Sequence, residues 1–131
     1  MAQETRLELE LERTVRAPAE ARSAVSEHLA ELGIDDPQGQ VLVLLVSEVV
    51  SNAVRHSSGP ADTKILLLAT ANEETVRVSV SDGGAGFTPR ARDPERIGEG
   101  YGLDLVAKVA SSWGVETAGG TTVWFELERS S

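Results

Sequence analysis

The stretch VLVLLVSEVVSNAVRHS, residues 41–57, decides the fold of this chain. Apolar side chains fill ten of its first fourteen positions and nearly surround a helix, which predicts that the helix is buried. The helix is expected to begin at Asp36 and Pro37, a capping residue followed by a good first helical residue. The Ser-Gly-Pro sequence at 58–60 is expected to end it.

Polar residues interrupt this apolar stretch at helical spacing. Glu48 and Asn52 stand four residues apart, so a helix places them on one face, and Ser51, Arg55 and His56 fall on the same stripe. A carboxylate inside an otherwise apolar helix needs a partner, because burying it unpaired is costly. The stripe is therefore either the wall of a polar binding site or the solvated face of the helix.

The segments that precede this helix predict one strand and one further helix. Leucine alternates with glutamate within Arg6–Val15, and a period of two is typical of a half-buried strand. Ala17–Leu32 carries apolar residues on one side and ends before Gly33, which predicts an amphipathic helix.

The segments that follow predict two hairpins and a third helix. Thr63–Ala69 and Thr75–Val80 are rich in β-branched residues and leucine, and turn residues separate them. A helix is expected from Gly102 to about residue 112, followed by a hairpin of Trp113–Glu116 and Thr122–Leu127. Strands paired as hairpins, with helices gathered between them, predict an α+β sandwich with helices on one sheet face.

Composition limits the classes of protein that fit the sequence. The chain has 131 residues, 40% of them hydrophobic and 25% charged, and is expected to form one domain, 1–131, with an ordered core of about 6–128. It has no cysteine, which excludes disulfides and thiolate metal sites. The longest apolar run, Val41–Val46, is too short to span a bilayer and the N-terminus is charged, so we expect a cytoplasmic protein without membrane attachment.

The net charge of −9 bears on the partners of the protein. An acidic chain repels nucleic acid backbones, so direct binding of DNA or RNA is not expected. The charge is explained either by solubility or by attraction to a basic protein partner.

Two glycine-rich segments carry the remaining candidates for chemistry. Asp82 ends a predicted strand and glycines follow at once, so its carboxylate is placed to accept a hydrogen bond from an amine such as that of adenine. A tight turn capped by Asp82 is the alternative. GEGYG, residues 98–102, leads into the third predicted helix, whose N-terminus suits phosphate. The long loop at 83–100 between them is either functional or disordered.

Together these segments resemble the GHKL ATPases, a family that includes gyrase and the histidine kinases. SEVVSNAVRH at 47–56 is similar to their N box, DGGAGF at 82–87 to their D-x-G-x-G box, and GEGYGL at 98–103 to their second glycine box. LLVSEVVSNAVRHS, GYGLDLV, SSWGVE and TTVWFEL further resemble small stand-alone actinobacterial relatives of the anti-sigma factor serine kinases. The resemblance extends from about residue 11 to residue 127.

The resemblance implies a Bergerat-type two-layer sandwich, with a mixed and mostly antiparallel sheet, that binds Mg²⁺-ATP. It implies that Glu48 is the catalytic general base, that Asn52 holds Mg²⁺ through its side-chain oxygen, and that Asp82 binds the adenine. Thr122 is expected to support the adenine beside Asp82, with Thr121 as the alternative. The other nucleotide-binding residues implied are Gly84, Gly86, Gly98, Gly100, Gly102 and Leu103.

The implied function is that of an anti-sigma factor type protein serine/threonine kinase. Its partners would be a sigma factor and a STAS-domain anti-anti-sigma factor, which it would phosphorylate, and a second copy of the chain is a further candidate partner. The alternative is a non-catalytic ATP-dependent switch module of the same fold. Such a module needs only Asn52 and Asp82, so the presence of Glu48 favours the enzyme.

Overall fold

The computed structural model describes residues 5–34, 36–56, 64–82, 103–116 and 121–129. Within these ranges the helices are α1 (Ala17–Glu27), α2 (Leu29–Leu32), α3 (Asp36–His56) and α4 (Asp104–Val109). The strands are β1 (Thr5–Glu12), β2 (Lys64–Ala71), β3 (Thr75–Asp82), β4 (Ser112–Glu116) and β5 (Thr122–Glu128).

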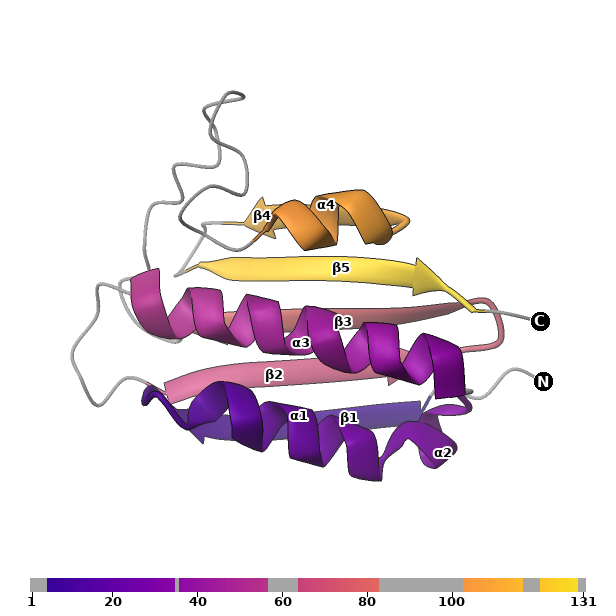
Figure 1. Cartoon of the computed structure of the whole chain (residues 1–131), viewed down its shortest axis with the longest axis horizontal. Coiled ribbons are helices and arrows are strands. Elements are labelled where there is room, and N and C mark those ends of the chain that lie inside the picture. Colours follow the sequence, from indigo (N-terminus) through magenta and orange to yellow (C-terminus); the bar gives the residue numbers. More distant parts are fainter. Residues whose placement is uncertain (1–4, 35, 57–63, 83–102, 117–120, 130–131) are drawn as a thin grey trace.

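The strands form one sheet in the order β1-β2-β3-β5-β4. Figure 1 shows the helices on one face of this sheet, so the predicted α+β sandwich is confirmed. Both predicted hairpins are present, as the pairs β2–β3 and β4–β5. All four pairs of neighbouring strands in the described ranges are antiparallel, so the parallel pairing of a mixed sheet does not occur among them.

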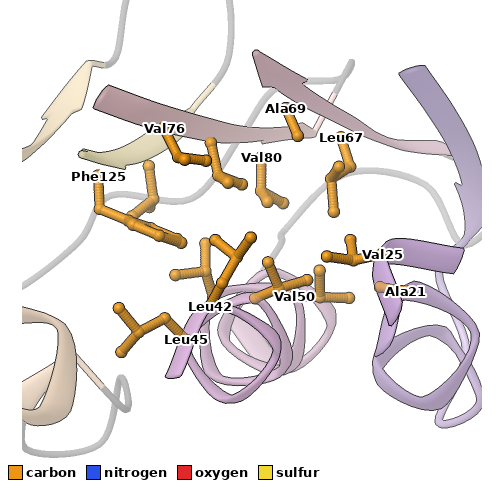
Figure 2. Packing of buried hydrophobic residues seen from close by; sticks show 14 of the residues in the cluster. Ala21, Val25, Leu42, Leu45, Val50, Leu67, Ala69, Val76, Val80 and Phe125 are labelled. Carbon is orange, nitrogen blue, oxygen red and sulfur yellow. The ribbon is translucent and has the colours of Figure 1, made fainter. Parts of the chain in front are cut away.

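The helix predicted to decide the fold, α3, lies in the middle of the helical layer between α1 and α4 (Figure 1). Figure 2 shows Leu42 and Val50 of α3 directed toward Val76 and Val80 of the sheet. Phe125 is the only aromatic side chain among the fully buried residues that the structure describes, so aliphatic side chains fill most of the core. None of the described helices is both long and apolar enough to cross a membrane.

The region predicted as one helix, 17–32, is divided in two at His28. The backbone N–H of His28 donates to the carbonyl of Val25, three residues back, at 3.0 Å, and its ring Nδ1 lies 2.7 Å from the carbonyl oxygen of Ala24. Bonds to the third residue back tighten a helical turn and are typical of helix ends, so α1 and α2 separate there. α2 ends before Gly33, where the helical region was predicted to end. The φ of +74° at Gly33 is left-handed backbone, which favours glycine and terminates the helix.

The C-terminal end of β5 is fastened to two turns. The guanidinium of Arg129 donates to the carbonyls of Gly33, at 2.6 Å, and of Asn72, and its backbone N–H donates to the carbonyl of Glu74. The side-chain oxygen of Asn72 accepts the backbone N–H groups of Glu74 and Thr75, which closes the β2–β3 turn. These bonds fix the edge of the molecule opposite to the edge where β3 ends.

Candidate functional site

The candidate site residues gather at the edge where α3 and β3 end. The two elements run in the same direction across the molecule, and β5 and α4 begin at this same edge (Figure 1). Glu48 and Asn52 lie in the last three turns of α3, and Asp82 is the last residue of β3. The fold therefore brings Glu48 and Asn52 of α3 and Asp82 of β3 to one end of the sandwich.

Strand alternation places the side chain of Asp82 inside the molecule. Val76, Val78, Val80 and Asp82 alternate with more exposed residues, so Asp82 lies on the helix-facing side of β3 and is only 2% exposed. Its Oδ1 accepts the backbone N–H of Thr121 at 3.2 Å, and its own N–H donates to the carbonyl of Thr121 at 3.1 Å. Its second oxygen, Oδ2, is buried and has no hydrogen-bond partner among the described residues. The carboxylate is thus held at one oxygen and open to a donor at the other.

Asn52 presents a second set of uncompensated polar atoms. Its side chain is 0% exposed, and neither Oδ1 nor Nδ2 has a hydrogen-bond partner within the described ranges. A buried amide without partners is costly, and proteins retain such groups where something binds them. The solvated-face interpretation of the helix stripe therefore does not apply to Asn52.

The rest of the stripe divides between the site and the surface. Glu48, one turn before Asn52, is half-buried. Ser51 and Arg55 lie on the outer side of α3, where the Arg55 guanidinium donates to the Ser51 hydroxyl at 2.8 Å. On α3, Asn52 therefore points inward and Glu48 lies at the boundary between core and surface. The outer residues Ser51 and Arg55 form an exposed hydrogen bond with each other.

Of the two threonines expected near the adenine, Thr121 takes the place beside Asp82. Thr121 is buried, and its backbone exchanges two hydrogen bonds with Asp82. Thr122 lies on the opposite face of the sheet, where its hydroxyl is 2.8 Å from the hydroxyl of Ser81. Alternation explains this, because Val123 and Phe125 face the core and residue 121 shares their side. The apolar pattern after the threonines is the sequence signal that identifies Thr121.

Of the second glycine box, residues 98–103, only Leu103 lies within the described residues. Its side chain is fully buried, and its carbonyl accepts the backbone N–H of Ala107 at 2.9 Å in the first turn of α4. Leu103 therefore anchors the start of α4 to the core. The predicted loop at 83–100 and the expected nucleotide-binding residues Gly84, Gly86, Gly98, Gly100 and Gly102 lie outside the described residues.

The polar atoms of the site fit an adenine nucleotide accompanied by a divalent cation. Oδ2 of Asp82 is an acceptor suited to an exocyclic amine, and Oδ1 of Asn52 is a neutral oxygen of the kind that Mg²⁺ takes in small number beside phosphate and water oxygens. Nowhere in the described ranges do three or more His, Cys, Asp or Glu residues form a group that could hold a metal ion.

Comparison with known protein families shows which family this chain belongs to. The sequence matches the histidine kinase-like ATPase domain over residues 11–127. The chain belongs to the histidine kinase-like ATPase family. The resemblance to the GHKL ATPases is thereby confirmed, and the family assignment implies that the chain binds ATP.

A solved structure supports the same assignment. This histidine kinase-like ATPase is similar to the RsbU and RsbW domains of Rv1364c from Mycobacterium tuberculosis, with a TM-score of 0.71 and 26% sequence identity. The similarity covers 97% of this chain and 34% of that one, so the chain spans about a third of the length of its structural relative.

Proposed function

We propose that this ATPase-family protein is a Mg²⁺-ATP-dependent protein serine/threonine kinase of the anti-sigma factor type, acting in the cytoplasm. The single observation that carries the proposal is the pair of uncompensated groups at one edge, the amide of Asn52 and Oδ2 of Asp82. Its substrate would be a serine or threonine hydroxyl of a STAS-domain anti-anti-sigma factor, and a sigma factor would compete for the protein. The similarity to the RsbU and RsbW domains of Rv1364c supports this class of partner.

Each residue has a separate task in this proposal. Oδ2 of Asp82 accepts a hydrogen bond from the adenine amine, while the bond from the backbone N–H of Thr121 to Oδ1 fixes the orientation of the carboxylate. Oδ1 of Asn52 holds Mg²⁺, which when bound neutralises charge on the phosphate oxygens. Glu48 accepts the proton of the attacking hydroxyl at its carboxylate, and its half-buried position allows contact with both the site and an incoming substrate.

Thermal unfolding tests the ligand. At Mg²⁺-ATP concentrations of about 100 times the dissociation constant, the folded protein is expected to gain about 2.7 kcal/mol of stability, because the ligand binds only the folded state. The midpoint of unfolding should therefore rise with Mg²⁺-ATP and rise less when EDTA removes the cation. A folded protein whose midpoint does not move at millimolar nucleotide would refute the proposed site.

Asp82→Asn tests the recognition of adenine. The Thr121 N–H requires an acceptor, so the new side chain must keep its carbonyl there and turn its NH₂ group toward the adenine amine. Two opposed donors leave both groups unsatisfied, and we expect ATP affinity to fall by about 10- to 100-fold, the equivalent of about 1–3 kcal/mol. GTP affinity should fall less, because the guanine carbonyl can accept from the NH₂ group.

The control for this substitution is Thr122→Val, and calorimetric titration with ATP and with GTP measures the affinities of both variants. Its hydroxyl is bonded to Ser81 on the far face of the sheet, so neither affinity should change. An unaltered ratio of ATP to GTP affinity in Asp82→Asn would show that Asp82 only joins the ends of two strands.

A further inference from the structure

The sheet has a second face that no described element covers. In Figure 1 the described helices all lie in front of the sheet. The residues that alternate with the buried ones along each strand form the outer face. Register defines this face, because Glu10, Leu66, Ser81 and Thr122 form one row across the strands. The next row consists of Glu8, Leu68, Ser79, Trp124 and Gly114.

The two rows of Leu66 with Ser81 and of Leu68 with Ser79 are uncharged in the middle of this outer face, and the charge nearest to them on this face of β3 is Arg77. A solvated antiparallel sheet is expected to direct polar side chains to water, yet Leu66 is 44% exposed and Leu68 lies beside it on the same strand. Trp124 is also on this face, at the other side of β3. An apolar and aromatic centre of this kind is typical of a protein–protein contact, where tryptophan often contributes most of the binding energy.

The outer face is hollowed beside β3, over β1 and β2. Ser79 and Ser81 have small side chains, and they lie between the leucines of β2 and Trp124 of β5. A hollow of about 490 Å³ lies over β1, β2 and β3, where Leu66, Leu68 and both serines line it. Arg6, Glu8 and Glu10 of β1 form its charged side, and Trp124 lies outside its lining. The flanking strands β2 and β5 are two strand spacings apart, about 10 Å, which matches the diameter of about 10–12 Å of an α-helix.

Trp124 is held firmly on β5, where it forms a wall of the outer face on the far side of β3 from the leucines. The Arg77 guanidinium lies 4.2 Å from the centre of its ring system, and Arg77 also pairs with Glu126 at 3.1 Å. Ser112 donates a further hydrogen bond to Glu126 at 3.0 Å. The indole covers Gly114, where an added Cβ would come within 2.9 Å of the ring nitrogen. A wall fixed in this way loses little side-chain entropy when a partner binds.

The rim of the face is acidic. Six glutamates lie around Leu66, Leu68 and the serines, and three basic residues of the face pair with three of them: Arg6 with Glu8, Lys64 with Glu12, and Arg77 with Glu126. Six negative charges against three positive ones leave a net charge of −3 on the outer face. The other rim glutamates are Glu10, Glu116 and Glu128.

We propose that the outer sheet face is a docking surface for a basic amphipathic helix of a partner protein. The apolar side of the helix would fill the hollow over Leu66, Leu68 and the serines, and its flanking Lys and Arg residues would meet the glutamates beside it, among them Glu8 and Glu10. A second copy of this face is a poor occupant, because it would bring a net charge of −3 against −3. The surface is on the opposite side of the sheet from the helices and the site, so it stands whether or not the proposed kinase function does.

Synthetic peptides of about 18 residues test the proposal, because a helix of that length spans about 27 Å and β3, with its eight residues, spans about 26 Å. The probe carries leucine at positions i, i+3, i+4 and i+7 with lysine on both flanks. A scrambled isomer and a version with glutamate for every lysine are the controls. Titration followed by amide NMR shifts should give shifts centred on Leu66, Leu68, Ser79, Ser81 and Trp124, and the scrambled and acidic peptides should bind at least tenfold more weakly.

Two substitutions connect binding to the surface. Leu66→Lys should lower the affinity for the cationic peptide by about 10- to 100-fold, because it removes a leucine that the peptide would bury and adds a charge of the same sign as the peptide. Glu10→Lys, at an exposed rim position, should weaken binding several-fold without disturbing the strand. Leu44→Lys is the matched control, since Leu44 is 48% exposed on α3, and it should leave binding unchanged.

Three results would overturn the proposal. Shifts spread over the whole acidic surface, or equal binding of the scrambled peptide, would reduce the effect to general charge attraction. A dimer of the free protein that Leu66→Lys dissociates in sedimentation would assign the face to a second copy. The melting midpoint and its rise with Mg²⁺-ATP should be the same in Glu10→Lys and wild type, which separates this surface from the nucleotide site.

Discussion

Glu48→Gln is expected to lower phosphoryl transfer to a STAS-domain acceptor by a factor of about 10²–10⁴, the usual contribution of a general base. Glutamine keeps the size and the hydrogen-bonding capacity of Glu48 but cannot accept a proton at pH 7. The rate is measured in single-turnover reactions by ADP formation and by mass spectrometry of the phosphorylated serine. The rise of the melting midpoint with Mg²⁺-ATP should be the same as in wild type, because the groups proposed to bind the nucleotide and its cation are Asp82 and Asn52.

The kinetic comparison also separates the enzyme from the non-catalytic switch. Equal rates in wild type and Glu48→Gln would remove Glu48 from the mechanism. A wild-type protein that binds Mg²⁺-ATP and transfers no phosphate to any STAS-domain acceptor would favour a switch that only reports the nucleotide.

Asn52→Leu is expected to have opposite effects on folding and on binding. Without nucleotide, the free energy of unfolding should rise by about 1–3 kcal/mol, because leucine replaces a fully buried amide that has no described hydrogen-bond partner with an apolar group of similar size. Stabilisation by Mg²⁺-ATP should be lost, because the variant lacks the side-chain oxygen that is proposed to hold the cation. Chemical denaturation with and without nucleotide measures both effects.

The control for this variant is Ser51→Ala on the outer side of the same helix. Its hydroxyl only accepts an exposed hydrogen bond from Arg55, so the stability should change by less than about 0.5 kcal/mol and the nucleotide effect should remain. If Asn52→Leu destabilises the free protein instead, the amide has partners in the folded chain and the binding argument fails.

The fold was largely predictable from the sequence because its elements follow simple periodicities. Alternating leucine and glutamate predicted β1, and the apolar run at 41–54 predicted the central buried helix. The division of the first helical region at His28 was not predictable, because it depends on local hydrogen bonds to Ala24 and Val25 rather than on hydrophobic pattern. Propensity and period describe where a helix can form, but not where a single residue tightens its last turn.

The candidate site was predictable only in part. The spacing of Glu48 and Asn52 gave their common face, but the burial of Asn52 became evident only from the packing of α3. Thr121 could have been placed beside Asp82 by alternation from Val123 and Phe125, whereas its two backbone bonds to Asp82 required the strand register. Pairings between distant strands arise from three-dimensional register, which a one-dimensional pattern does not contain.

The fastening of Arg129 to the turns at Gly33 and Asn72 has a practical consequence. Thr5 pairs with Ala71 at this same end of the sheet, so the described chain both enters and leaves the domain there. A fluorophore, linker or solid support attached beyond either end would be separated from the edge with Asp82 by a strand length, about 26 Å. The same arrangement allows such a domain to be carried within a longer polypeptide with the edge that holds Asp82 facing away from the tethers.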